Sequence, residues 1–202
     1  MSRGNVILLA TVVAIALIAV AAASVLHDGV SSRAKPTALE TMMAREVRHM
    51  AIPASARGMQ NPVAETQEIL RDARLHFADH CAICHANDGG GDTLIGRNLY
   101  PKPPDLRQED TQKLADGELF WIIENGVRFT GMPAFGGAHA SEQDSWKLVR
   151  FLRHLRRLTE EERVEMERYN PKGPEDLEEE QEENDFLRGA PIQQKPEEAH
   201  HH

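Results

Sequence analysis

Cysteine is almost absent from this chain of 202 residues, which has two, Cys81 and Cys84. Two cysteines cannot supply four thiolates to a zinc ion. A mixed zinc site would need a second pair of thiols or histidines at a similar spacing, and the segment around these cysteines offers none. A structural zinc site is therefore disfavoured.

The chain also lacks an excess of basic charge, since its formal net charge is −9. Residues 159–202 hold 15 of the 32 acidic residues and 5 of the 23 basic ones, so the rest of the chain has a balance of +1. No basic domain or recognition motif is present, which argues against nucleic acid as a partner. Gly89–Gly91 lacks a following Gly-Lys-Ser/Thr and is not a phosphate-binding loop.

The two cysteines stand in the run Cys81-Ala82-Ile83-Cys84-His85. Two thiols at this spacing can add to the two vinyl groups of a haem, while the adjacent histidine ligates the iron. A redox-active dithiol has the same spacing but does not require His85. The motif predicts one covalently bound haem c, attached through Cys81 and Cys84, with His85 as an axial ligand.

A second candidate ligand is Met132, in the loop Gly131-Met132-Pro133-Ala134-Phe135. It is the only methionine between the cysteine motif and the acidic tail, and it follows His85 by 47 residues. A thioether favours ferrous iron, and its pairing with histidine raises the potential of a haem. Met132 is predicted as the second axial ligand, with His139 as the alternative.

An apolar run without charges extends from Val6 to Leu26. As a helix it would be about 30 Å long, which matches the core of a bilayer. A signal peptide has an apolar region of about 7–15 residues, and Ala21–Ser24 could serve as its cleavage site, but the greater length favours an uncleaved single-pass anchor within residues 1–26. The flanking charges Arg3, Arg33 and Lys35 do not decide the topology.

Residues 27–65 are expected to form a stalk. Thr37 and Glu40 form a capping box, and apolar residues at helical spacing predict an amphipathic helix from Ala38 to about Met50. It would pack on the following domain or lie on the membrane surface. Its methionines, Met42, Met43 and Met50, are expected to fill an apolar face rather than to ligate a metal. Residues 54–62 have the composition of a linker.

Residues 66–158 are expected to form a haem domain. Ile69, Ala73, Phe77 and Cys81 share one side of a predicted helix that ends at the cysteine motif. Another helix should begin with Asp116 as its N-cap and stop at Asn125-Gly126. The last, Trp146–Leu158, follows a capping-box variant at Ser141 and has an apolar stripe opposite a basic face.

This segment resembles a class I cytochrome c domain. The likeness is carried by Phe77, the cysteine motif, Asn125-Gly126, the run from Met132 to Phe135 and the aromatic Phe151, and it extends to single-haem domains of bacterial membrane-bound cytochromes and of c-type subunits of haem-copper oxidases. It implies an all-α fold around one haem, with the first and last helices crossing near Ala73 and Phe151. It also implies a position on the periplasmic side of the bacterial cytoplasmic membrane, where haem c is attached.

In two places the chain departs from that family. Ala73 stands where a glycine is common, a small change that still permits close helix contact. Gly96-Arg97-Asn98-Leu99 replaces a Gly-Pro-Asn-Leu segment whose proline carbonyl orients the proximal histidine. Pro101 or Pro103 is expected to provide that carbonyl instead.

With His85 and Met132 both on the iron, no position remains for a substrate, so the chain is predicted to be an electron carrier and not an enzyme. Its donor would be a quinol-oxidising complex or a dehydrogenase, and its acceptor a terminal oxidase or reductase. The alternatives are a peroxidase-like or gas-binding haem protein with an open sixth position, and a structural subunit of a redox complex.

The acidic tail, residues 159–202, begins with a predicted charged helix from Thr159 to Tyr169. Residues 171–185 have little apolar surface to bury. The tail could fold back on the basic face of the preceding helix or leave it free for an acidic partner. His200, His201 and His202 are a weak metal site at most.

Overall fold

A computed structural model of the protein describes residues 2–28, 31–137, 141–173, 182, 184, 185, 187 and 188. Within these residues the structure is helical and has no strand. The helices are α1 (Arg3–Asp28), α2 (Ala38–Ala51), α3 (Ala54–Arg57), α4 (Gln67–His80), α5 (Ala82–His85), α6 (Leu94–Arg97), α7 (Glu109–Gln112), α8 (Asp116–Asn125), α9 (Glu142–His154), the 3-10 turn η1 (Leu155–Arg157) and α10 (Glu160–Glu167). The predicted all-α fold class is confirmed.

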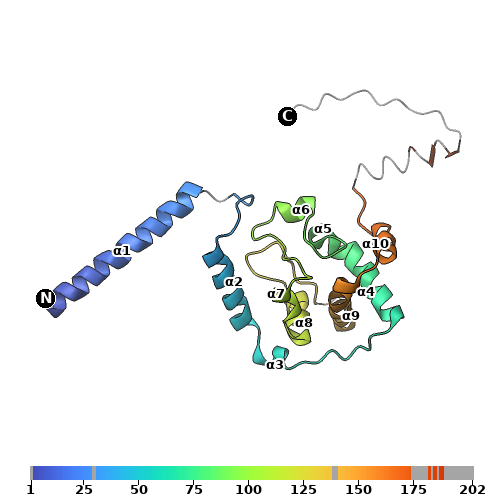
Figure 1. Ribbon diagram of the computed structural model, residues 1–202, viewed down its shortest axis with the longest axis horizontal. Coiled ribbons are helices and arrows are strands. Elements are labelled where there is room, and N and C mark those ends of the chain that lie inside the picture. The colour runs from blue at the N-terminus through green and yellow to red at the C-terminus, as the bar shows by residue number, and fades with distance from the viewer. Residues whose placement is uncertain are drawn as a thin grey trace.

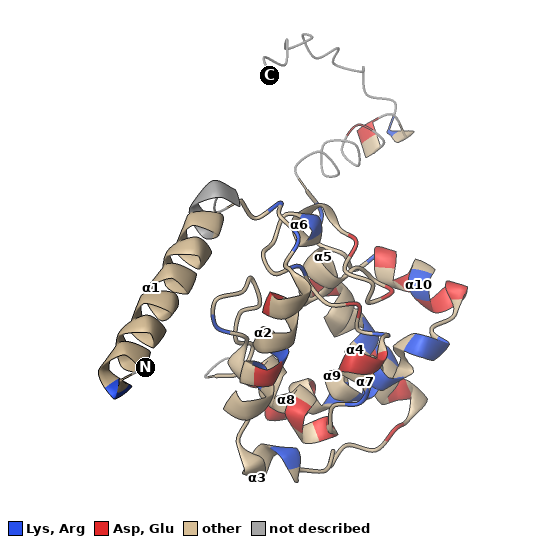
Figure 2. Ribbon diagram, turned by 60° about the vertical axis from the view of Figure 1, so that its left-hand side comes forward, with Lys and Arg blue, Asp and Glu red and all other residues tan. Residues whose placement is uncertain are grey.

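Helix α1 stands apart from the packed helices (Figure 1). Its segment Arg3–Ser24 is long and apolar enough to cross a bilayer, and none of it is buried against the rest of the protein. Over this segment, Figure 2 shows a charged residue only at the N-terminal end. A signal sequence would share these properties.

The core of the packed helices is built on the contact between α4 and α9, with α8 packed on α9. Ala73 of α4 is buried, and the rings of Phe77 and Phe151 lie 5.1 Å apart between their centroids. Phe120 of α8 stacks on Trp146 of α9 at 4.1 Å. The expected crossing of the first and last helices of the domain, near Ala73 and Phe151, is confirmed.

The segment expected to be a linker contains α3, which packs on α8. The two helices meet at Gly117, where an added Cβ would lie 1.9 Å from the carbonyl oxygen of Ala56. A larger residue cannot be placed there without moving α3. Ile52, at the end of α2, is also buried, so the chain before Thr66 is packed against the haem domain.

One helix start was predicted with the wrong residue in the cap position. The N-cap of α8 is Ala115, and Asp116 is the first helical residue. The Asp116 carboxylate accepts hydrogen bonds from Arg153 instead, and Glu118 reaches back to accept the backbone N–H of Ala115 at 2.8 Å. Because the Asp116 carboxylate is bound to Arg153 of α9, it does not cap α8.

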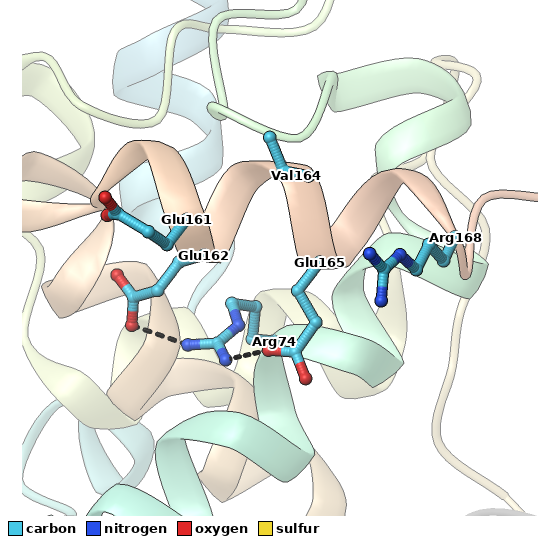
Figure 3. Close-up of a pocket in the computed structure, with 6 residues that line it drawn as sticks. All are labelled: Arg74, Glu161, Glu162, Val164, Glu165 and Arg168. Atoms are coloured by element: carbon cyan, nitrogen blue, oxygen red, sulfur yellow. Dashed lines mark hydrogen bonds and ion pairs between the residues drawn. The ribbon is translucent and has the colours of Figure 1, made fainter.

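The charged helix predicted at the start of the tail is present as α10, and it packs on α4. Arg74 of α4 lies between Glu162 and Glu165 and donates to both, as Figure 3 shows. Met166 is completely buried. α10 is thus part of the folded domain and not a solvated extension.

The basic side chains of α9 are held by partners within the domain. Lys147 pairs with Asp72 at 2.6 Å, and Arg153 pairs with Asp116 at 2.8 Å. Arg150 donates to the carbonyl oxygen of Val63 at 2.8 Å. Of the acidic residues of α10, Glu162 and Glu165 pair with arginines of α4, and Glu162 also meets His154 of α9 at 2.9 Å. Glu160 and Glu167 pair with Arg163 within α10. The basic side chains of α9 therefore connect this helix to other parts of the same domain.

Candidate haem-binding site

A cavity of about 740 Å³ lies among α2, α4, α5, α8, α9 and the loops that join them. Its volume is in the range of cofactor sites in proteins. The structure brings Cys81, Cys84, His85 and Met132 together on its wall. Apolar side chains form much of the remainder, among them Phe77, Leu99, Leu119, Ile122, Ile123, Val127, Phe135, Leu148 and Leu152.

The cysteine motif is held by the end of α4 and the single turn α5. Cys81 is the C-cap of α4, and its backbone N–H donates to Phe77 at 2.8 Å. The N–H of His85 donates to the carbonyl oxygen of Cys81 at 2.9 Å. The prediction that α4 delivers the first cysteine from its end is confirmed, and one helical turn fixes the spacing of the two thiols and the imidazole.

The loop after the motif forms hydrogen bonds with the backbone of α5. Gly91 donates its N–H to the carbonyl oxygen of His85 at 2.8 Å, and the hydroxyl of Thr93 donates to that of Ile83 at 2.8 Å. Gly96 lies so close that an added Cβ would be 2.6 Å from the carbonyl oxygen of Cys84. Backbone contacts therefore position the thiols and the histidine.

The His85 ring is suited to ligate a metal. Burial lowers the pKa of His85 to about 4, and the backbone carbonyl of Pro104 opposes that shift. Nδ1 is buried and makes no direct hydrogen bond within the described part of the chain. The imidazole is therefore neutral at neutral pH, as ligation requires. The carbonyl that acts on the pKa of the ring is that of Pro104, and not that of Pro101 or Pro103 as expected.

The two thiols do not have the properties of a redox-active dithiol. Burial raises the pKa of Cys81 to about 12, and it also raises that of Cys84. A catalytic dithiol has a lowered pKa at its nucleophilic cysteine. In the described part of the chain no group of three or more His, Cys, Asp and Glu side chains lies close enough together to hold a metal ion.

The Met132 loop is pinned to the end of α8. Val127 donates its N–H to the carbonyl oxygen of Met132 at 3.2 Å, and Phe135 donates to that of Ile123 at 3.0 Å. Gly126 has a φ of +65°, and an added Cβ would lie 2.6 Å from the Pro133 backbone. A glycine is needed here because the chain turns in the left-handed region while the loop returns against it.

Sequence reasoning missed the contribution of α2 to this cavity. Thr41, Ala44, Arg45 and Arg48 line one wall of it. Burial and then repulsion by Arg45 lower the pKa of Arg48, so its guanidinium stands in a poorly hydrated place. The capping box could locate the helix, but no local signal reveals which of its faces meets the haem domain.

The other histidines of the chain do not share one location. His80 lines the cavity and stacks on His76 at 4.7 Å between ring centroids. His49 meets Glu118 at 3.3 Å, outside the cavity wall. The alternative ligand His139 and the terminal His200, His201 and His202 lie outside the described residues.

These groups fit a haem by their own chemistry. The wall supplies two neutral thiols, a neutral buried imidazole and a thioether, in a largely apolar enclosure that also has a cation, Arg48. Thiol, imidazole and thioether are the groups that hold haem in c-type proteins. The apolar wall would contact the flat haem ring, and Arg48 would be available to pair with the haem carboxylates.

Comparisons with known proteins agree with this geometry. Residues 68–152 match the family model described as cytochrome c oxidase, cbb3-type, subunit III. The match covers less than half of the chain and includes the cysteine motif and Met132. A comparison with curated protein sequences finds no significant match. Residues 68–152 are a cytochrome c domain of the cbb3-type oxidase subunit III kind.

Proposed function

We propose that the protein is a membrane-tethered, extracytoplasmic electron carrier that uses a single haem c. One observation carries the proposal: Cys81, Cys84, His85 and Met132 line the same cavity although Met132 is distant in sequence from the other three. A haem bound there supplies a one-electron iron couple. The match of residues 68–152 to an oxidase-related cytochrome c family supports this use.

Each residue has a separate task in this proposal. Cys81 and Cys84 would hold the haem by thioether bonds, and His85 and Met132 would ligate its iron from the protein. The thioether of Met132 would favour the reduced state and raise the potential. Arg48, one of three basic residues on the cavity wall with Arg45 and Lys102, would be suited to pair with the haem carboxylates. The apolar walls would exclude water and so limit the reorganisation that accompanies electron transfer.

The tether would be α1, which is long and apolar enough to span a bilayer. Since haem c is attached outside the cytoplasm, residues after α1 would lie on the periplasmic side of a bacterial cytoplasmic membrane. Electrons would come from a quinol-oxidising complex or a dehydrogenase and pass to a terminal oxidase or reductase. The oxidase-related family of residues 68–152 supports this class of partner.

Carbon monoxide distinguishes a carrier from an enzyme. The ferrous holoprotein, purified in detergent, should show no rapid change in its visible spectrum on addition of the gas, because Met132 occupies the sixth position. Rapid and complete binding would indicate an open position and a haem enzyme or gas-binding protein. The tether is tested separately. The protein should stay in the membrane fraction when membranes are extracted with alkaline carbonate, and its intact mass should include the residues of α1.

A further inference from the structure

Helix α2 has two faces with different surroundings. Its outward face has a stripe of large apolar side chains that are more than half exposed: Leu39 (61%), Met42 (56%), Met43 (56%), Val47 (57%) and Met50 (69%). No residue of α2 is buried. The stripe extends over three turns of the helix, since its members recur at intervals of three and four residues.

The inward face of α2 is polar and is fixed to the haem domain. Glu40 accepts a hydrogen bond from the Tyr100 hydroxyl at 3.2 Å, and Arg45 pairs with Asp110 at 2.6 Å. Thr41, Ala44 and Arg48 line the haem cavity. These contacts orient the helix so that the apolar stripe points away from the domain, and the stripe therefore needs a partner outside it.

The place of α2 in the chain indicates what that partner is. Nine residues, 29–37, join the end of α1 to the start of α2, a span of at most about 30 Å. Arg33 and Lys35 lie in this connection and would meet anionic lipid headgroups at the surface that α1 leaves. A helix with an apolar stripe and a polar opposite face, placed beside a membrane, has the pattern of an interfacial helix.

We propose that the apolar stripe of α2 docks the haem domain on the surface of an anionic phospholipid bilayer. The proposal deepens the proposed function and rests on its membrane tether. Glu46 lies within the stripe, so the helix would lie at the level of the headgroups, where a carboxylate can reach water, rather than deeper in the acyl chains. Because α2 is also a wall of the haem cavity, docking would fix the angle between the haem plane and the membrane.

Linear dichroism of the haem absorption tests this orientation. The full-length holoprotein is placed in oriented bilayers of phosphatidylcholine and phosphatidylglycerol. The wild type should show strong dichroism of the Soret band. The double variant Met43→Glu with Val47→Glu should lose it and keep the same visible spectrum, because the α2 surface would no longer hold the haem domain at a fixed angle to the bilayer.

A matched control carries the same change of charge elsewhere. Leu94→Glu with Val164→Glu alters two exposed apolar residues, of α6 and α10, and should retain the dichroism of the wild type. Dichroism that persists in the α2 variant, or is absent from the wild type in lipid alone, would overturn the proposal. Dichroism that appears only with a membrane protein partner would also overturn it, since the stripe would then bind protein.

Failure of the tether is recognised by a different result. If the mature protein lacks α1 by intact mass, the tether is wrong, and the stripe is then tested by flotation of that protein with the same vesicles. Flotation that the α2 double variant loses and the control retains would still support lipid docking. Equal flotation of the three proteins, or none in any, would overturn it.

Discussion

His85 illustrates how much of the site depends on single backbone groups. The motif of two cysteines and a histidine indicates the ligand, but the state of the imidazole comes from its surroundings: burial lowers its pKa to about 4 and the Pro104 carbonyl acts on the ring. A buried histidine that stays neutral is in the protonation state that a metal ligand requires. The motif does not indicate which proline carbonyl acts on the His85 ring, because that depends on the path of the following loop.

At this scale we first predict the effect of removing the thiols. Cys81→Ser with Cys84→Ser should leave no covalently bound haem and little folded protein, because the cavity of about 740 Å³ would lack the group that fills it. Haem staining of a denaturing gel and intact mass measure the attachment. Ile83→Ser, between the two cysteines and 45% exposed, is the control and should keep its haem. Covalent haem in the double variant would refute the assignment of the thiols.

The sequence predicts the residues of the site better than it predicts their supports. Cys81, Cys84 and His85 are indicated by adjacency, and Met132 by its solitary place in a proline-stiffened loop. Pro104 could not be chosen over Pro101 or Pro103, since three prolines in one loop have equal local signals and only the folded loop selects one.

The helices differ in how far local signals determine them. Thr37 and Glu40 form the predicted capping box of α2, with the Glu40 N–H donating to Thr37 at 3.2 Å. The sequence offers folding of this tail onto the basic face of the preceding helix, but not its packing on α4, because a helix of sequence Glu-Glu-Glu-Arg-Val-Glu-Met-Glu has little apolar surface. One fully buried side chain, Met166, and the partner Arg74 of α4 decide its position. Such long-range pairing leaves no periodic pattern in the sequence.

A second prediction concerns α10 as an element. Truncation after Leu158 should lower the free energy of unfolding by about 2 kcal/mol, mainly because Met166 is no longer buried. The ion pairs should add little, since Arg74 would become hydrated once α10 is gone. Denaturant unfolding of the holoprotein measures the change. Truncation after Gly173, which keeps α10, is the control and should match the full chain. Equal stability of both truncated proteins would contradict the packing of α10.

A third prediction follows from the charges on the same helix. Hydrogen bonds from Arg74 and then Arg71 lower the pKa of Glu165, against the opposing effect of burial. Its ordinary value is 4.5, so the stability that it contributes is complete above that pH and is lost as pH falls through the lower pKa of the folded state. The midpoint of thermal unfolding should therefore decrease from about pH 5 to about pH 3.

Glu165→Gln should flatten part of that decrease and lower the midpoint at neutral pH. Glu161→Gln, an exposed carboxylate of the same helix, is the comparison and should leave the slope as in the wild type. A Glu165→Gln profile parallel to that of the wild type would show that the pair with Arg74 contributes nothing to folding.

In the whole molecule the parts have a consistent order along the chain. An apolar helix is followed by α2, whose polar face closes the haem cavity and whose apolar face points outward. The cytochrome c domain comes next, and α10 packs on α4, the first helix of that domain. We propose that this order sets the haem at a constant place beside a membrane, where donor and acceptor can meet it by diffusion in two dimensions.

The central claim is that Met132 completes the coordination of a single haem c. The most direct test is the ferric visible spectrum of the purified holoprotein, in which an iron–thioether bond gives a weak band at the red edge. The wild type and Met59→Ala, whose methionine does not line the cavity, should both show this band. Met132→Ala should keep its covalent haem, lose the band, fall in reduction potential and bind carbon monoxide when reduced. An unchanged band and potential in Met132→Ala would contradict the assignment and leave His139 as the candidate ligand.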